Sequence, residues 1–367
     1  MPILLPTTVV GSYSVPEWLE RLKTDFYRKQ LSAAHLSDVH DVAIKAAIKD
    51  QEMAGIDIVS DGELRRDNDV DYLLARMPGV KAVTTVKSYY FDYHDLVLAI
   101  PLTEQPVGLA EDFRFTREHT DRPIKFSFTG PFSLSRRIRD EAYGDRAELV
   151  RALARALNAE ARDLVSAGAT LLQIDEPFLA GYPEQVALAV EAINIVTEGV
   201  EATWGLHVCY GNRYARPSWE GHYTFLFPSV LDAHVDQLIL EFARKGDEDL
   251  PAIAELGWDR ALGLGVLDVK SETVESSEWV AKRISRALEV IDADKLIINP
   301  DCGLRHVAPH VARAKLRAMV EGAAVVRHRL LGTAERSMSS GYDRPGPADS
   351  RDHAAGRAQE AVGRSSA

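Results

Sequence analysis

Eight short apolar runs recur along the chain, each too continuous for a strand with one face in water. They occupy residues 7–13, 57–63, 124–130, 170–176, 204–210, 237–242, 261–268 and 296–301. Runs of this length, rich in β-branched and aliphatic residues, are typical of strands buried on both faces of a parallel sheet. The pattern therefore predicts eight buried strands.

Helical segments lie between most of these runs. Two of them end alike, with Gly55 just before the second run and Gly168 just before the fourth. A glycine there supplies the left-handed residue that ends a helix. Eight strands alternating with helices predict an α/β fold of the (β/α)8 TIM-barrel type. An open doubly wound sheet is the alternative, but Gly263-Leu264-Gly265 continues as a strand instead of forming a phosphate-binding loop.

Two stretches depart from this alternation. Residues 77–122 are longer than an ordinary connection and contain an aromatic cluster at 89–93, which predicts an inserted hairpin or lid after the second strand. From residue 333 the chain turns to Ser, Gly, Pro, Ala and charged residues, the composition of a disordered tail. We therefore expect one barrel domain over residues 1–332 and a disordered tail over 333–367.

Composition narrows the class of protein. The chain of 367 residues is 46% hydrophobic with a formal net charge of −12, and none of its apolar runs approaches the roughly 20 residues of a membrane span. Its arginines are dispersed, as over 146–162, whereas nucleic-acid binding needs basic residues clustered on one face. Residues 3–10 lack the basic start of a signal peptide. We predict a cytoplasmic protein with neither membrane nor nucleic acid as partner, and find no sequence signal for an oligomeric state.

Polar side chains lie at or near the C-terminal ends of the predicted strands. In chain order they are Ser12, Asp61 with Glu63, Thr129, Asp175 with Glu176, His207 with Cys209, Glu241, Asp268, and Asp301 with Cys302. Structural strands more often end in neutral turn residues, and barrel enzymes place their chemistry at the C-terminal ends of the strands. The sequence therefore predicts an active site at this face.

The two cysteines of the chain lie at two of these strand ends, Cys209 in His207-Val208-Cys209 and Cys302 in Asp301-Cys302-Gly303. Because side chains two residues apart on a strand point the same way, His207 and Cys209 can both face the barrel mouth. A core histidine beside a buried thiol is one alternative. A disulfide is another, which a reducing cytosol disfavours.

Glu241 lies within the apolar run 238–242, where a carboxylate is costly unless it is paired or bound to a metal. Thiolate and imidazole are preferred ligands of zinc, which in catalytic sites keeps a position open for water or substrate. The set His207, Cys209, Glu241 and Cys302 therefore predicts a Zn²⁺ site.

From about residue 7 to 331 the chain resembles the catalytic barrel of the cobalamin-independent methionine synthase family. The matching phrases are Val10-Gly11-Ser12-Tyr13, Asp61-Gly62-Glu63 followed by Arg66, Thr129-Gly130-Pro131, Gln173-Ile174-Asp175-Glu176-Pro177, His207-Val208-Cys209-Tyr210 and Asn299-Pro300-Asp301-Cys302-Gly303. Any one phrase is weak, but several in this order are specific.

The resemblance implies that His207, Cys209, Glu241 and Cys302 bind zinc. It also implies a homocysteine site in which Ser12 holds the carboxylate and Glu63 and Asp175, with Glu176 beside them, hold the ammonium through charge-assisted hydrogen bonds. The implied activity is transfer of a methyl group from methyltetrahydrofolate or another donor to homocysteine, forming methionine. Glu63 and Asp175 can alternatively be strand-end caps or partners of Arg65 and Arg66.

The chain also departs from the family pattern. Folate-using members carry an additional N-terminal barrel and a tryptophan shortly after the Thr-Gly-Pro phrase, where this chain has residues 133–137 without one. They have an Asp-x-His step where this chain has Asp268-Val269-Lys270. We predict Asp268 and Lys270 as catalytic residues, although a lysine pKa near 10.4 suits a proton donor only if burial lowers it.

Other activities remain open on the sequence alone. Short relatives include epoxyalkane–coenzyme M transferases, whose sulfonate-bearing thiol would favour nearby arginines such as Arg65, Arg66, Arg136 and Arg137. A zinc-binding barrel without catalysis is a second alternative. A decarboxylase like the porphyrin-processing barrels is a third and would need no metal.

Overall fold

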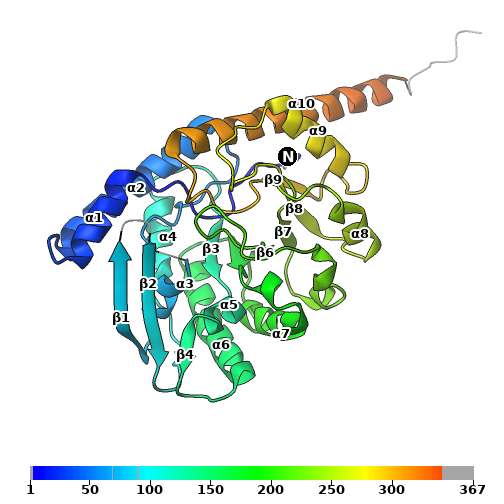
Figure 1. The fold of residues 1–367 in the computed structure, drawn as a ribbon. Coiled ribbons are helices and arrows are strands. Elements are labelled where there is room, and N and C mark those ends of the chain that lie inside the picture. Colours follow the sequence, from blue (N-terminus) through cyan, green and yellow to red (C-terminus); the bar gives the residue numbers. More distant parts are fainter. Residues whose placement is uncertain (1–2, 68, 89–90, 341–367) are drawn as a thin grey trace, which may run out of the picture. The chain divides into compact units, whose positions relative to one another are not determined.

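The computed structural model describes residues 3–67, 69–88 and 91–340 (Figure 1). The chain divides into two compact units, Met1–Arg327 and His328–Ala367. All the strands and the predicted site belong to the first unit. The described part of the second unit is the end of helix α10 (Pro309–Ser340).

Six parallel strands form the central sheet, in the order β3-β5-β6-β7-β8-β9. They are β3 (Phe126–Thr129), β5 (Leu171–Asp175), β6 (Thr203–Val208), β7 (Gln237–Leu240), β8 (Ala261–Gly265) and β9 (Leu296–Asn299). Each corresponds to one of the predicted apolar runs. Their side chains are almost all buried, as expected for strands covered on both faces.

The first two predicted runs join this sheet only through single parallel bridges, Thr7 with Ile298, Thr8 with Ile58 and Val59 with Ile124. These bridges link β9 back to the segment before β3, so the ring closes and the predicted (β/α)8 barrel is confirmed. The Asp57 carboxylate also accepts hydrogen bonds from both the Thr7 amide and the Thr7 hydroxyl, each at 2.8 Å, which ties the first run to the second.

Helices surround the strands of the first unit in Figure 1. They are α1 (Glu17–Tyr27), α2 (Ala33–Ala54), α3 (Asp69–Leu74), α4 (Leu109–Arg117), α5 (Pro131–Ser135), α6 (Arg146–Ser166), α7 (Val186–Thr197), α8 (Asp249–Glu255), α9 (Ser277–Ala287) and the start of α10, with short 3-10 turns at Leu179–Gly181, Pro183–Gln185, Tyr223–Leu226 and Ser229–Asp232. The two predicted helix ends are confirmed, since Gly55 has φ of 88° and Gly168 has φ of 100°.

The predicted insertion is a hairpin outside the barrel. Strands β1 (Val80–Ser88) and β2 (Phe91–Leu98) pair antiparallel, and β4 (Ile138–Asp140) adds to β2 in parallel. This small sheet is separate from the barrel sheet. Residues 89 and 90 of the predicted aromatic cluster lie outside the described residues.

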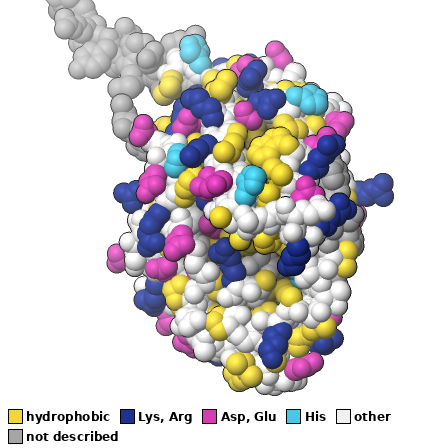
Figure 2. Space-filling view, turned by 90° about the vertical axis from the view of Figure 1, so that its left-hand side faces the viewer, with side chains coloured by type: hydrophobic (Ala, Val, Ile, Leu, Met, Phe, Trp, Pro, Cys, Tyr) yellow, Lys and Arg dark blue, Asp and Glu magenta, His cyan; other side chains and the backbone are white. Residues whose placement is uncertain are grey.

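Helix α10 continues to Ser340 and so passes the boundary predicted at residue 332. The rest of the predicted tail lies outside the described residues. None of the helices described has both the length and the apolar character needed to cross a bilayer. On the face drawn in Figure 2, basic and acidic side chains are interspersed.

Candidate metal and substrate site

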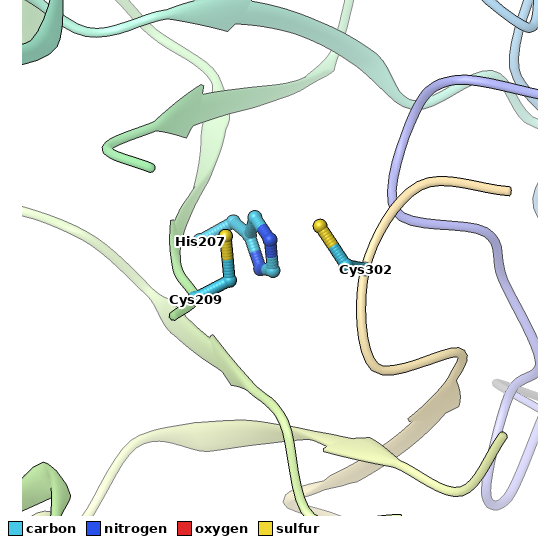
Figure 3. A group of neighbouring side chains, drawn as sticks. All are labelled: His207, Cys209 and Cys302. Atoms are coloured by element: carbon cyan, nitrogen blue, oxygen red, sulfur yellow. The ribbon is translucent and has the colours of Figure 1, made fainter. Parts of the chain in front are cut away.

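Three metal-ligating side chains converge at the C-terminal face of the barrel. His207 and Cys209 come from β6 and the residue after it, and Cys302 comes from the loop that follows β9. Their ligand atoms all lie within 4.8 Å of one another. Figure 3 shows Cys302 approaching the imidazole from the side opposite the β6 segment. The two cysteines predicted to share a site therefore do so, and both are free thiols.

The imidazole of His207 is oriented for a ligand. Its Nδ1 lies 3.1 Å from the Ile239 carbonyl oxygen. Because a carbonyl only accepts, Nδ1 carries a proton, and Nε2 is the nitrogen left to bind a metal when the ring is neutral. That Nε2 atom is buried and has no hydrogen-bond partner among the described residues. Metal-bound histidines commonly donate their second N–H to a carbonyl in this way, so the donor set and the unpaired nitrogen fit a metal ion.

The electrostatics of the cysteines also suit a cation. Hydrogen bonding to Cys209 and burial raise the pKa of the Cys302 thiol well above its ordinary value. Thiolate, not thiol, is the ligand form. A bound cation would therefore supply the positive charge that deprotonates this pair.

Glu241, the predicted fourth ligand, adjoins the cluster and is fully buried. Its Oε1 lies 2.8 Å from Lys270 Nζ and accepts from the Tyr210 amide at 3.2 Å. Its Oε2 has no hydrogen bond in the described structure and lies 3.8 Å from Arg244 Nε. The carboxylate thus has one oxygen engaged and one available, and its role as a ligand stays a prediction.

Two buried residues hold the loop that carries Glu241. Asp301 accepts hydrogen bonds from the amides of residues 242, 243 and 244 at 2.9, 2.7 and 2.9 Å. The Tyr223 hydroxyl accepts from the Glu241 amide at 3.0 Å and donates to the Val208 carbonyl at 3.1 Å. Neither contact was predicted from the sequence, although Asp301 directly precedes Cys302.

Ser12 and Asp175 lie beside the metal ligands. Asp175 is the register partner of His207 on the neighbouring strand. Ser12 packs against Gly303, the residue after Cys302, so closely that a Cβ at position 303 would lie 1.9 Å from the Ser12 hydroxyl oxygen. The Leu304 amide also donates to the Ser12 carbonyl at 2.8 Å. The structure therefore brings both predicted substrate residues to the cluster.

Glu63 lies on the other side of the Gly11-Ser12 turn. A Cβ at Gly11 would lie 2.4 Å from Glu63 Oε1. The same oxygen accepts from the Ser127 hydroxyl at 2.6 Å and lies 3.3 Å from Arg66 Nη1. Glu63 has φ of 57°, a left-handed conformation that is uncommon for a residue with a side chain and typical of functional sites. The predicted salt-bridge alternative is thus present for Arg66, whereas Arg65 pairs with other carboxylates.

The structure does not support Glu176 as a substrate contact. Its Oε1 accepts from the Phe132 amide at 3.0 Å, and its Oε2 accepts from the Ser133 amide and hydroxyl at 2.8 and 2.6 Å. The physical reason is strand alternation, since neighbouring residues such as Asp175 and Glu176 point to opposite sides. Glu176 fastens α5 to the end of β5.

Asp268 and Lys270 are linked to each other and to Glu241. Asp268 Oδ1 accepts from the Lys270 amide at 2.8 Å, and the Lys270 ammonium contacts Glu241. Burial lowers the Lys270 pKa, but the charges of Glu241 and the two cysteines outweigh it and the pKa is raised. Lys270 is thus paired with Glu241, and its role and that of Asp268 as catalytic residues stay predictions.

The arginines considered for a sulfonate are engaged elsewhere. Arg65 contacts Asp41 and Asp112, Arg66 contacts Glu63, and Arg137 contacts Asp71. The Arg136 guanidinium lies 4.0 Å from the centre of the Tyr182 ring. Three of the four charges are thus already matched by carboxylates, which does not favour a sulfonate-bearing thiol.

Known proteins share this fold and much of this sequence. A family model described as the catalytic domain of cobalamin-independent synthase matches residues 5–325. A methionine synthase of Saccharolobus solfataricus is 36% identical over 331 residues, covering 89% of this chain and 96% of that protein. One from Thermococcus kodakarensis is 37% identical over 334 residues, covering 89% and 95%.

A solved structure agrees with these relatives. The B12-independent methionine synthase of Shewanella sp. W3-18-1, in complex with selenomethionine, superposes with a TM-score of 0.80 at 29% identity. The match covers 90% of this chain and all of that one, 100%.

Proposed function

The chain belongs to the family of cobalamin-independent synthase catalytic domains, and we propose that it transfers a methyl group to homocysteine, forming methionine, with zinc as its metal. One observation carries the proposal: the His207, Cys209 and Cys302 cluster lies directly beside Asp175 and Ser12. The proposed metal site, which would bind the substrate sulfur, therefore adjoins the proposed site for its amino-acid end.

In this proposal, one group of residues binds the thiol end of homocysteine and another binds its amino-acid end. Zinc held by His207, Cys209 and Cys302, with Glu241 as the predicted fourth ligand, would keep a substrate thiol ionised and nucleophilic at neutral pH. Ser12 would receive the carboxylate of homocysteine, and Glu63 and Asp175 its ammonium. Holding both ends aligns the sulfur with the incoming methyl carbon, and such alignment accounts for much of the rate of a two-substrate reaction.

In the reaction, a bond forms between the substrate sulfur and the methyl carbon while the bond from that carbon to the donor breaks. The donor is methyltetrahydrofolate or another methyl compound. The departures at residues 133–137 and at Lys270 concern this half of the reaction. Asp268 and Lys270 stay the predicted catalytic residues for this half, and Lys270 also pairs with Glu241.

Cys302→Ser tests the proposal. Removing one thiolate should lower the bound zinc to well below one equivalent and reduce methionine formation by at least about thirtyfold, because without its metal a thiol of pKa about 8.5 is only about 3% ionised at pH 7. Zinc content, methionine formation with a series of methyl donors, and circular dichroism would be measured together. A folded variant with full activity would contradict the metal assignment.

A parallel assay separates the acceptors. Homocysteine and coenzyme M would each be offered to the wild-type protein with a methyl donor such as methyltetrahydrofolate and, separately, with an epoxyalkane, and the methylated or alkylated product would be measured by mass spectrometry. We expect product from homocysteine alone, because three of the four candidate arginines already contact carboxylates. Product from coenzyme M alone would contradict the proposed acceptor.

A further inference from the structure

Lys125 is a buried lysine for which the proposed chemistry has no use. It directly precedes β3, and its side chain is 1% exposed. Ser127, two residues on, directs its hydroxyl to Glu63, so strand alternation points Lys125 to the same, inner side of the barrel. Its Nζ has no hydrogen-bond partner among the described residues. A buried ammonium in that state is costly.

The other two fully buried lysines are satisfied. Lys23 Nζ donates to the Arg66 carbonyl at 2.8 Å, and Lys315 Nζ donates to the Thr273 carbonyl and to Glu275. Lys125 differs from these two lysines, because its ammonium interacts with nearby charges but forms no hydrogen bond in the described structure. Those charges belong to Asp175 at the end of β5 and to Glu63 in the segment after α2.

These are the two carboxylates proposed to receive the substrate ammonium. Glu63 already has the Arg66 guanidinium at 3.3 Å. Arg66 also faces the buried Asp61, so a protonated Lys125 adds a second positive side chain to this group of three carboxylates. Burial lowers the pKa of Lys125 to about 7, and the charges of Asp175 and Glu63 raise it and so limit the drop. The lysine is consequently poised to change its charge near neutral pH.

We propose that Lys125 is the internal counter-ion of the amino-acid site, a positioning residue that balances Asp175 and Glu63 in the empty pocket and releases its proton when the substrate ammonium arrives. This inference rests on the proposed function and adds a mechanism of substrate selection. Two ammonium groups near the same carboxylates in a low-dielectric interior repel each other strongly. The proton passes from Lys125 Nζ to the solvent, so the charge of the pocket is the same before and after binding.

The exchange favours ligands that carry an amine. A thiol or thioether without an ammonium leaves Lys125 charged and gains nothing from Asp175. Since binding releases a proton, affinity for the amino acid should rise with pH through about 7 and level off once Lys125 is already neutral.

Calorimetric titration of the zinc-loaded, full-length protein with methionine tests the inference. Methionine has the carboxylate and ammonium of homocysteine but no thiol proton, so the metal site releases none. Binding heats in phosphate and Tris, which differ in ionisation enthalpy, give the protons released per methionine bound. At pH 7 we expect roughly half a proton, because a group with a pKa near 7 is half protonated there, and only about a tenth at pH 8, where the amine of methionine is still charged.

Two comparisons assign that proton. The methionine analogue that lacks the amine should release none from the wild-type protein. Lys125→Met should bind methionine without proton release, whereas Lys315→Met, which removes another buried lysine, should keep the release per bound methionine. If Lys125→Met fails to fold, the wild-type protein still provides the test: equal proton release for methionine and its amine-free analogue would overturn the inference.

The outcomes separate this inference from the proposed function. Methionine that binds the wild-type protein with no proton release, or with a release unchanged in folded Lys125→Met, would overturn the role of Lys125 and leave the amino-acid site intact. Failure of both methionine and homocysteine to bind would overturn the proposed function itself.

Discussion

Close approach to glycine positions the proposed substrate residues. Ser12 fits against Gly303 and Glu63 against Gly11, in each case nearer than a Cβ would allow. Gly303 follows Cys302, a proposed metal ligand, so this contact would couple the proposed carboxylate end of the site to its proposed metal end. A side chain at position 303 would displace Ser12 or Cys302.

Gly303→Ala should therefore weaken homocysteine binding by about 10- to 100-fold, equivalent to the roughly 1–3 kcal/mol that overpacking costs. Gly221→Ala is a matched control, because a Cβ there would meet its nearest atom at an ordinary 3.5 Å. Isothermal titration with homocysteine would measure both. Equal affinities for the two variants would argue against the positioning role of Gly303.

Lys270 stabilises a buried carboxylate that we predict as a metal ligand. Lys270→Met leaves Glu241 with only the Tyr210 amide and the more distant Arg244, and breaking a buried ion pair on one side costs about 3–5 kcal/mol. If Glu241 also binds the metal, this loss should be large in metal-free protein and clearly smaller with zinc bound. Urea unfolding of both forms measures it, and Lys270→Arg, which keeps the charge, is the control. The same loss with and without zinc would exclude Glu241 as a ligand.

At the scale of the elements, the adjacent acidic residues Asp175 and Glu176 at the end of β5 make different contacts. Asp175 lies beside His207 on the neighbouring strand, and Glu176 holds α5 on β5 with both of its oxygens. Strand alternation could have separated the two from the sequence alone. The contact of Lys270 with Glu241 could not have been predicted in this way, because it joins long side chains from segments that the sequence does not align.

Glu176→Gln should lower the free energy of unfolding by about 1–3 kcal/mol, since an amide NH₂ would face N–H and O–H donors at the start of α5. The KM for homocysteine should change less than twofold, because Glu176 contacts no proposed substrate group. Glu184→Gln, an exposed residue nearby in sequence, is the stability control. A large KM effect with unchanged stability would restore Glu176 to the substrate site.

At the scale of the whole barrel, the sequence predicted the architecture well, because buried parallel strands leave continuous apolar runs. Six of these runs are strands, and the two that are not, at 7–13 and 57–63, still close the ring through single bridges. Side-chain hydrogen bonds, such as that from Thr7 to Asp57, add to the few backbone hydrogen bonds there, and hydropathy does not encode them.

The rule that chemistry gathers at strand ends also brought distant residues together correctly. His207, Cys209 and Cys302 were placed in one site from that rule and from alternation, and their ligand atoms meet within 4.8 Å. Lys125 had no such signal, because a single lysine at the start of an apolar run is not distinctive. Its burial becomes apparent only when the ring closes.

Zinc K-edge X-ray absorption on the purified protein, with and without homocysteine and with coenzyme M in parallel, tests the central claim most directly. We predict zinc with two sulfur ligands in the free protein and a third sulfur when homocysteine is added, with no such change for coenzyme M. A protein that binds no zinc, or zinc whose ligands stay the same with homocysteine, would contradict the account.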